Sequence, residues 1–212
     1  MTINYENLNN CKSNIKKFDN SRLLIVTKNQ SLDDIEELIN SGYRMFGENR
    51  VQEAKLKYSS INNFEDINLH LIGPLQTNKV KDALMLFDTI ESIDRKKLVD
   101  EIFKVTNKTP KIKTNNYYIQ INIGSEDQKF GVDKSEVFEL YEHAISKNLS
   151  IEGFMCIPPN TNSPEKYFQE MNIIRDSLDK GLKLSMGMSN DYLLALKNNS
   201  NIVRIGSLIF ND

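Results

Sequence analysis

Short apolar runs alternate along the chain with longer stretches in which apolar and polar residues repeat at helical spacing. Short runs bounded by polar residues are typical of buried strands, whereas the longer stretches predict amphipathic helices. The strand-like runs cover residues 23–27, 43–46, 69–72, 88–93, 117–123, 151–157, 182–188 and 201–205. Helices are predicted at residues 4–18, 32–40, 51–58, 78–86, 134–147, 164–180 and 192–197. One more helix is predicted after the strand-like run at residues 88–93, and it ends at residue 106.

This alternation predicts an α/β protein whose parallel strands are joined by helical crossovers. Eight such strands favour a single (β/α)8 barrel of the TIM type, with an extra N-terminal helix and with residues 1–212 as one domain. An open, doubly wound sheet would show the same local pattern. Such a sheet is expected to carry the Gly-x-Gly-x-x-Gly signature of a dinucleotide site after its first strand, and the sequence has none there.

Composition narrows the classes of function. The chain of 212 residues has 39% hydrophobic and 26% charged residues, as folded globular proteins do. Its net charge of −2 gives no basic field for nucleic acid or a membrane, and no signal peptide or membrane-spanning run is found. Cys11 and Cys156 lack metal-ligand spacing and His70 and His143 are far apart, so we expect no metal site. We expect a reducing, cytoplasmic setting.

Lys28 comes directly after the first apolar run, Leu24-Ile-Val-Thr27. At the end of a buried strand we expect the lysine to be drawn partly out of water, which favours the uncharged, nucleophilic amine. Such an amine forms Schiff bases with carbonyl compounds, pyridoxal 5′-phosphate (PLP) included. The carboxyl ends of the strands are also the functional face of such a barrel. A solvated lysine at a strand-to-loop junction is the alternative interpretation.

The segment Lys183-Leu-Ser-Met-Gly-Met-Ser189 predicts a place for an anion. With strand periodicity, Ser185, Gly187 and Ser189 share a small, hydroxyl-bearing face, and the residues between them share an apolar one. Ser189 or Asn190 is expected to cap the following helix and to direct its amides toward the same anion. Ordinary helix capping, with a glycine that serves packing, is the alternative.

The last strand-like run ends in Arg204-Ile-Gly-Ser207. Arg204 and Gly206 fall on the same face, and an arginine inside a barrel strand is seldom fully buried without a partner. Gly206 and Ser207 provide backbone amides and a hydroxyl where the chain leaves the strand, at the usual phosphate-binding place of this fold. The alternative for Arg204 is a salt bridge at the rim.

Two further strand ends carry polar side chains. Gly47 permits close approach of a ligand to the backbone, and Asn49 can hydrogen-bond a ring substituent. From these residues alone, a turn with an asparagine cap before the helix at Val51 is the better interpretation. After the third strand, Gln76 to Lys79 are interpreted as the start of the next helix.

Five motifs occur in the order and spacing of a known protein family. They are Val26-Thr-Lys28, Phe46-Gly-Glu-Asn-Arg-Val-Gln-Glu53, Leu71-Ile-Gly-Pro-Leu-Gln-Thr-Asn-Lys79, Leu184-Ser-Met-Gly-Met-Ser-Asn-Asp191 and Val203-Arg-Ile-Gly-Ser-Leu-Ile-Phe210. Together they resemble the PLP homeostasis protein family, also called the proline synthetase co-transcribed homologues, over nearly the whole chain. Each motif is modest, but five in order with matching spacing are specific.

The resemblance implies a barrel similar to the N-terminal domain of bacterial alanine racemase. It implies PLP as the cofactor, no catalytic residues and no metal. The cofactor-binding residues that it implies are Lys28 for the Schiff base, Ser185 or Ser189 with Gly206 and Ser207 for the phosphate, Arg204 facing the pyridine nitrogen, and Asn49 near the ring.

The sequence departs from the family at secondary positions. The family usually has histidines where Pro74 and Glu91 stand, a second lysine near Gln30, and a glycine where Asn211 stands. None of these changes removes the Schiff-base lysine or the phosphate segments. They bear on secondary roles, such as transient transfer of PLP through neighbouring lysines. Lys129, in Gln128-Lys-Phe-Gly131, matches a lysine of the family and is assigned no more than a rim role.

Family members are described as PLP carriers or regulators without established enzymatic activity. The resemblance therefore implies a non-catalytic protein of vitamin B6 homeostasis, with PLP-requiring apoenzymes as candidate partners. A monomer is expected, because the β domain that gives the racemases one dimer interface is not expected here. The chemistry agrees, because Arg204 has only hydrogen-bond donors and would keep the PLP ring neutral, which weakens carbanion stabilisation. The racemases take a second base from an additional β domain, which is not expected here, and Tyr43 is a candidate substitute. A racemase that uses the barrel alone, and a PLP-free barrel enzyme acting on a phosphorylated metabolite, are the alternatives.

Overall fold

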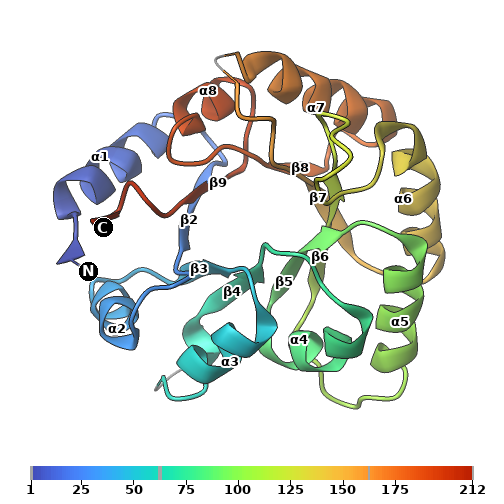
Figure 1. Ribbon diagram of the computed structural model, residues 1–212, viewed down its shortest axis with the longest axis horizontal. Helices are drawn as coiled ribbons and strands as arrows, with labels where there is room; N and C mark the ends of the chain where they lie inside the picture. The colour runs from blue at the N-terminus through green and yellow to red at the C-terminus, as the bar shows by residue number, and fades with distance from the viewer. Residues whose placement is uncertain (1, 62–63, 162, 212) are drawn as a thin grey trace.

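Eight parallel strands form a closed barrel in the computed structural model, which describes residues 2–61, 64–161 and 163–211. Neighbouring strands along the chain pair with each other, and the first and last pair to close the ring, with Leu23 opposite Val203. The predicted (β/α)8 barrel is thus confirmed (Figure 1). The strands are β2 (Arg22–Val26), β3 (Met45–Glu48), β4 (Asn68–Leu71), β5 (Thr89–Ile93), β6 (Asn116–Ile121), β7 (Ile151–Cys156), β8 (Lys183–Ser185) and β9 (Ile202–Ile205).

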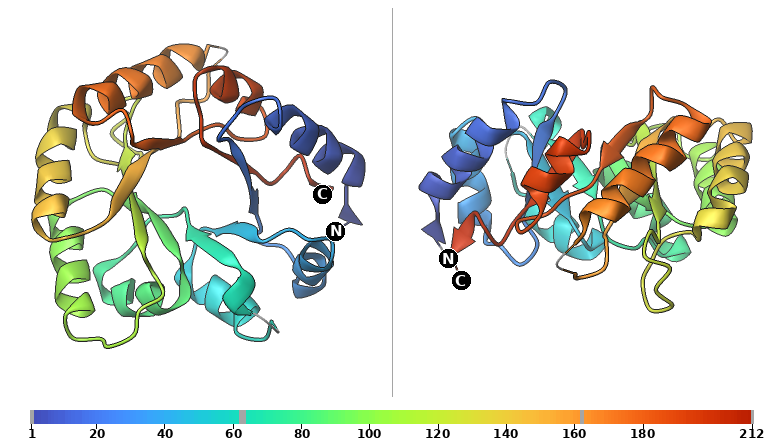
Figure 2. Two further views of the ribbon diagram at one scale, coloured as in Figure 1. Left: turned by 180° about the vertical axis from the view of Figure 1, so that it is seen from behind. Right: turned by 90° about the horizontal axis from the view of Figure 1, so that it is seen from above.

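Helices surround the barrel on its outside (Figure 2). The extra N-terminal helix is present as α1, and Asn4 caps it by accepting a hydrogen bond from the amide of Asn7 at 3.0 Å. None of the described helices is both long and apolar enough to cross a membrane. The helices are α1 (Tyr5–Ile15), α2 (Leu32–Asn40), α3 (Val51–Tyr58), α4 (Val80–Leu86), α5 (Lys96–Thr106), α6 (Val137–Ser146), α7 (Glu165–Leu178) and α8 (Tyr192–Lys197), with short 3-10 turns at Phe64–Asp66, Thr77–Lys79 and Lys134–Glu136.

The apolar core has two layers. The larger layer lies between the strands and the helices and includes the fully buried rings of Phe46, Phe154 and Phe168. A smaller cluster contains Leu24 and Val26 of β2 together with residues from other strands, and so fills the inside of the barrel. Because side chains alternate along a strand, every second residue of β2 faces the barrel interior. The chain leaves β2 after Val26, at the carboxyl end of the barrel.

A small two-stranded sheet outside the barrel was not predicted. β1 (Thr2–Ile3) pairs antiparallel with β10 (Phe210–Asn211), so the two ends of the chain lie side by side (Figure 2). The amide of Asn4 donates to the carbonyl of Ile209 at 2.7 Å and extends this junction. Strands of two residues carry no periodicity, so the sequence pattern gave no signal for them. Met1 and Asp212, the ends of the predicted domain, lie outside the described residues.

One predicted strand is much shorter than expected. The run at residues 182–188 forms a strand only at Lys183–Ser185, because Gly187 adopts a φ of +94° that an extended strand does not permit. The expected shared face of Ser185 and Ser189 is therefore wrong. The chain turns at Gly187, and the two serines lie in different environments.

Candidate ligand site at the carboxyl end of the barrel

Lys28 lies in a tight turn just after β2. The amide of Gln30 donates to the carbonyl of Thr27 at 3.0 Å and closes the turn, in which Asn29 has a φ of +62°. The Lys28 side chain is exposed, so the expectation that it is drawn partly out of water is wrong. The strand ends at Val26, and the lysine stands beyond it at the open end of the barrel. Within the described part of the chain its ammonium group has no hydrogen bond or ion pair, which leaves the amine free for a ligand.

The hydroxyl-bearing rim stands beside the end of β2. β2 and β9 are hydrogen-bonded neighbours, and Gly206, directly after β9, packs so closely on Val26 that a Cβ there would lie 3.2 Å from the Val26 Cβ. The hydroxyl of Ser207 and the amide of Leu208 both donate to Ser189 Oγ, at 3.1 and 3.3 Å. Two donors of the loop after β9 thus converge on the hydroxyl oxygen of Ser189 in the loop after β8, an arrangement suited to a phosphate oxygen in the same place.

A buried polar network fills the barrel below this rim. Arg204 donates from Nη1 to Ser185 Oγ at 2.9 Å and from Nη2 to the carbonyl of Cys156 at 2.7 Å. Ser185 Oγ in turn donates to Glu91 Oε2 at 2.5 Å, and the other oxygen of Glu91 lies 2.5 Å from Nδ1 of His70. The alternative interpretation of Arg204, a salt bridge at the rim, is therefore wrong. Of the two serines considered for the phosphate, Ser185 belongs to this buried network and Ser189 to the rim.

The partners of Glu91 in the network hold it in its charged form. Burial by itself raises the pKa of Glu91, but the hydrogen bond from His70 and the charges of His70 and Arg204 outweigh it and place the pKa below its ordinary value. The carboxylate is therefore ionised at neutral pH. It holds Arg204 through the hydroxyl of Ser185, which fixes the guanidinium in the barrel interior.

Asn49 stands at the end of β3, next to the strand that carries Lys28. Its side chain is half-buried and has no hydrogen-bond partner within residues 2–61, 64–161 and 163–211. The predicted asparagine cap is wrong, since the residue that precedes α3 as its N-cap is Arg50. The amide of Asn49 is thus available to a ligand at the barrel opening.

Two other predictions about helix starts have different outcomes. Gln76 to Lys79 do lead into a helix, since the 3-10 turn there continues directly into α4. Neither Ser189 nor Asn190 caps α8, whose N-cap is Asp191. The carboxylate of Asp191 instead accepts the amide of Met188 at 2.6 Å and shapes the loop that carries Ser189.

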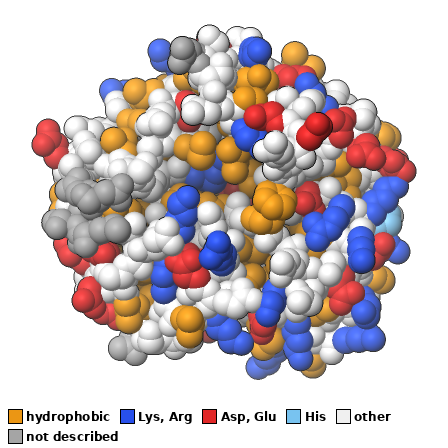
Figure 3. All heavy atoms as spheres, viewed as in Figure 1, with side chains coloured by type: hydrophobic (Ala, Val, Ile, Leu, Met, Phe, Trp, Pro, Cys, Tyr) orange, Lys and Arg blue, Asp and Glu red, His pale blue; other side chains and the backbone are white. Residues whose placement is uncertain are grey.

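The basic residues of the rim differ in how they are held. Lys129 pairs with Glu126 at 2.6 Å and donates to the carbonyl of Pro158 at 3.1 Å, so it fastens two loops to each other. Figure 3 looks onto the same end of the barrel as Figure 1 and shows Lys and Arg side chains beside the central hollow.

No group of three or more His, Cys, Asp or Glu side chains suited to a metal ion occurs among the described residues.

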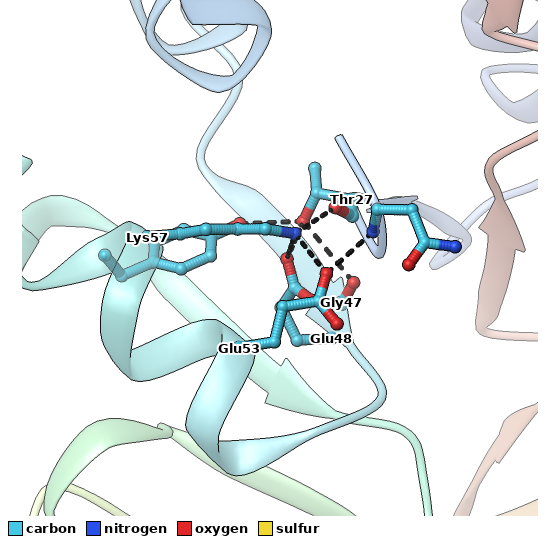
Figure 4. Close-up of polar contacts among 7 residues, drawn as sticks. Thr27, Gly47, Glu48, Glu53 and Lys57 are labelled. Atoms are coloured by element: carbon cyan, nitrogen blue, oxygen red, sulfur yellow. Dashed lines mark hydrogen bonds and ion pairs between the residues drawn. The ribbon is translucent and has the colours of Figure 1, made fainter. Parts of the chain in front are cut away.

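Two residues that sequence reasoning missed hold the turn that carries Lys28. Glu53 and Lys57, both on α3, bond to the backbone on either side of Lys28 (Figure 4). Their spacing of four residues is that of an ordinary surface ion pair on a helix, so the sequence offered no signal for this contact.

Comparison with known proteins places the chain in a family. Residues 4–212 match the family described as alanine racemase, N-terminal domain. A pyridoxal phosphate homeostasis protein of Aquifex aeolicus (strain VF5) is 38% identical over 201 residues, which are 91% of this chain and 87% of that protein. These matches confirm the resemblance found in the sequence motifs.

Solved structures agree on the fold. PipY of Synechococcus elongatus PCC7942 has a TM-score of 0.86 and 29% identity without PLP, and 0.85 and 28% with PLP bound, over 97% of this chain and 99% of that one. An alanine racemase of Clostridium difficile 630 is 17% identical with a TM-score of 0.74, covers 99% of this chain and 60% of its own, and supports the fold alone. The chain therefore belongs to the pyridoxal phosphate homeostasis protein family and has the barrel of the alanine racemase N-terminal domain.

Proposed function

We propose that this protein binds PLP as a Schiff base on Lys28 and serves PLP homeostasis without turning over a substrate. The observation that carries the proposal is the juxtaposition of an unpartnered lysine after β2 with the hydroxyl of Ser207 and the amide of Leu208, which follow the neighbouring strand β9. The names of the relatives and the PLP-bound PipY structure support it.

The residues at the barrel opening fit this cofactor. Ser189, Ser207 and the amide of Leu208 are donors suited to a phosphate group, and Asn49 offers a free side-chain amide for a ring substituent. In the covalent step, the ε-amine of Lys28 adds to the aldehyde carbon of PLP. A C=N bond then replaces the C=O bond, and the carbonyl oxygen leaves as water with both protons of the amine.

Arg204 argues for a carrier. PLP supplies an electron sink when its ring nitrogen is protonated, and a group that only donates hydrogen bonds does not favour that protonated form. We assign Arg204 to the pyridine nitrogen, with Ser185 and Glu91 holding the guanidinium in place from below.

Neither Tyr43, the candidate second base, nor the buried Tyr118 supports racemisation. Tyr43 precedes β3 and so lies at the opposite end of the barrel from Lys28, where the ammonium of Lys12 stacks on its ring at 5.3 Å. Tyr118 lies inside the barrel, and burial raises the pKa of its phenol well above the ordinary value, so it offers no phenolate at neutral pH. The proposal extends to a monomeric, cytoplasmic protein that exchanges PLP with apoenzymes; two free, buried cysteines fit a reducing compartment.

Borohydride reduction tests the site directly. The protein is titrated with PLP, reduced, and digested, and the modified lysine is mapped by peptide mass. We expect label at Lys28 alone and its loss in Lys28→Ala. Scattered label, or none, would contradict PLP binding at Lys28 and would favour the alternative of a PLP-free barrel enzyme that acts on a phosphorylated metabolite.

A second measurement separates carrier from enzyme. Protein loaded with PLP is mixed with L-alanine and the optical rotation is followed. A constant rotation is expected, and sustained racemisation would overturn the non-catalytic assignment.

A further inference from the structure

The two peptide groups that flank Lys28 are both held by side chains of α3 (Figure 4). Before Lys28, the ammonium of Lys57 donates to the carbonyl of Thr27 at 2.7 Å. After Lys28, the amide of Asn29 donates to Glu53 Oε1 at 2.7 Å. The Glu53 carboxylate and the Lys57 ammonium also pair with each other at 2.6 Å, so the contacts form one continuous clamp around the backbone of Lys28.

The clamp is itself anchored in the protein. Lys57 is only 13% exposed and bonds Glu48 Oε1 at 3.0 Å in addition to Glu53 and Thr27, which uses all three of its hydrogen-bond donors. The hydroxyl of Thr27 donates to the same oxygen of Glu48 at 2.8 Å, and Tyr58 OH lies 2.8 Å from that hydroxyl. Lys57 and Thr27 are thus each tied to β3 by a further bond to Glu48.

The clamp holds a tight turn. Asn29 has a φ of +62°, a left-handed conformation that is uncommon for non-glycine residues and that asparagine adopts more readily than most. The turn also lies at the exposed end of the barrel, where Lys28 itself makes no polar contact within the described part of the chain. The backbone of Lys28 is therefore fixed while its side chain is free.

We propose that Glu53 and Lys57 are positioning residues, which hold the backbone of Lys28 so that its amine meets the aldehyde of a cofactor anchored at Ser189 and Ser207. The inference rests on the proposed function. Holding a reacting group in place lowers the entropic cost of forming the covalent bond, whereas it contributes nothing to contacts made by the phosphate and the ring.

Two ligands separate these contributions. PLP forms the imine, whereas pyridoxine 5′-phosphate has the same ring and phosphate with an alcohol in place of the aldehyde and cannot. The binding constants of both are measured for the wild type, Glu53→Ala, Glu53→Gln and Lys55→Ala, with circular dichroism to verify folding. Lys55→Ala is the matched control, because Lys55 lies on the same helix but pairs with Asp82 on α4 at 3.2 Å.

Glu53→Ala removes both the bond to the Asn29 amide and the pair with Lys57. We expect imine formation with PLP to weaken about tenfold, as for loss of a hydrogen bond to a charged group, and pyridoxine 5′-phosphate to bind as in the wild type. Glu53→Gln keeps an acceptor for the Asn29 amide but loses the charge that pairs with Lys57, so it should weaken imine formation by a smaller, measurable amount. Lys55→Ala should leave both constants unchanged.

Several outcomes would overturn the clamp. Equal weakening of both ligands would reduce Glu53 to a structural role, and unchanged imine formation in folded Glu53→Ala would leave it without any role. If Glu53→Ala does not fold, Glu53→Gln is used in its place. In folded Glu53→Gln, an unaltered ratio of the PLP and pyridoxine 5′-phosphate binding constants would contradict a role of the ion pair in positioning. Failure of the proposed function is distinct, because the wild type itself would then show no borohydride label at Lys28.

Discussion

Glu91→Gln tests the buried network that holds Arg204. Glu91 is fully buried, and its two oxygens meet His70 and Ser185, each at 2.5 Å. Glutamine keeps the shape but removes the negative charge, so the guanidinium of Arg204 would remain buried with only a hydroxyl and a carbonyl as partners. Removing one member of a buried ionic group costs about 3–5 kcal/mol, a large part of the ~5–15 kcal/mol that a domain has in total.

Urea unfolding of the wild type and Glu91→Gln at a series of pH values measures this loss. The pKa of Glu91 is lowered in the folded protein, so its stabilisation is fully present above the ordinary value of 4.5 and is lost as the pH falls through the lower, folded value. We therefore expect the gap between the two proteins to be largest at neutral pH and to close in acid. Glu101→Gln is the control, since Glu101 pairs with Lys104 at the surface and should shift stability by less than about 1 kcal/mol. An equally stable Glu91→Gln, or a gap that is independent of pH, would refute the reasoning.

Three further predictions concern the rim, the turn at Gly187 and a buried thiol. Ser189→Ala with Ser207→Ala should weaken pyridoxine 5′-phosphate about tenfold in a titration and leave the binding of pyridoxine, which lacks the phosphate, unchanged. Gly187→Ala should cost about 2–4 kcal/mol in urea unfolding, because φ is +94° and the added Cβ would lie 2.4 Å from a Cβ of α8; Gly42→Ala, with φ +89° and open space, should cost less. Burial raises the pKa of the Cys156 thiol to about 12, so iodoacetamide at pH 8 should modify it only in unfolded protein, as mass spectrometry would show.

The fold could be predicted where periodicity is long and regular. α2, α3 and α8 have the bounds that the sequence pattern indicates, and the barrel follows from the alternation of strands and helices. The pattern failed where one residue changes the backbone, as Gly187 does at the end of β8. It also gave no signal for β1 and β10, whose pairing joins the two ends of the chain.

The site could be predicted only in outline. Because all strands of the barrel are parallel, Lys28 and Ser207 had to share one end, and β2 and β9 had to be neighbours once the barrel closed. The sequence did not separate Ser185 from Ser189, since that depends on the turn between them. The burial of Arg204 against Ser185, rather than at the rim, depends on contacts across the barrel that no local pattern encodes.

The contrast between Lys28 and Lys57 shows which of the two lysines suits the reactive role proposed for Lys28. Lys57 lies closer to buried carboxylates than Lys28 does, yet its three donors are occupied by Thr27, Glu48 and Glu53, and a nucleophile must have a free lone pair. Lys28 is exposed and makes no polar contact in the described residues, so its amine pays no cost in lost bonds when it reacts. The same ion pair that occupies Lys57 fixes the backbone of Lys28. A rigid lysine and a free one are therefore parts of a single arrangement, in which the first holds the backbone from which the second extends.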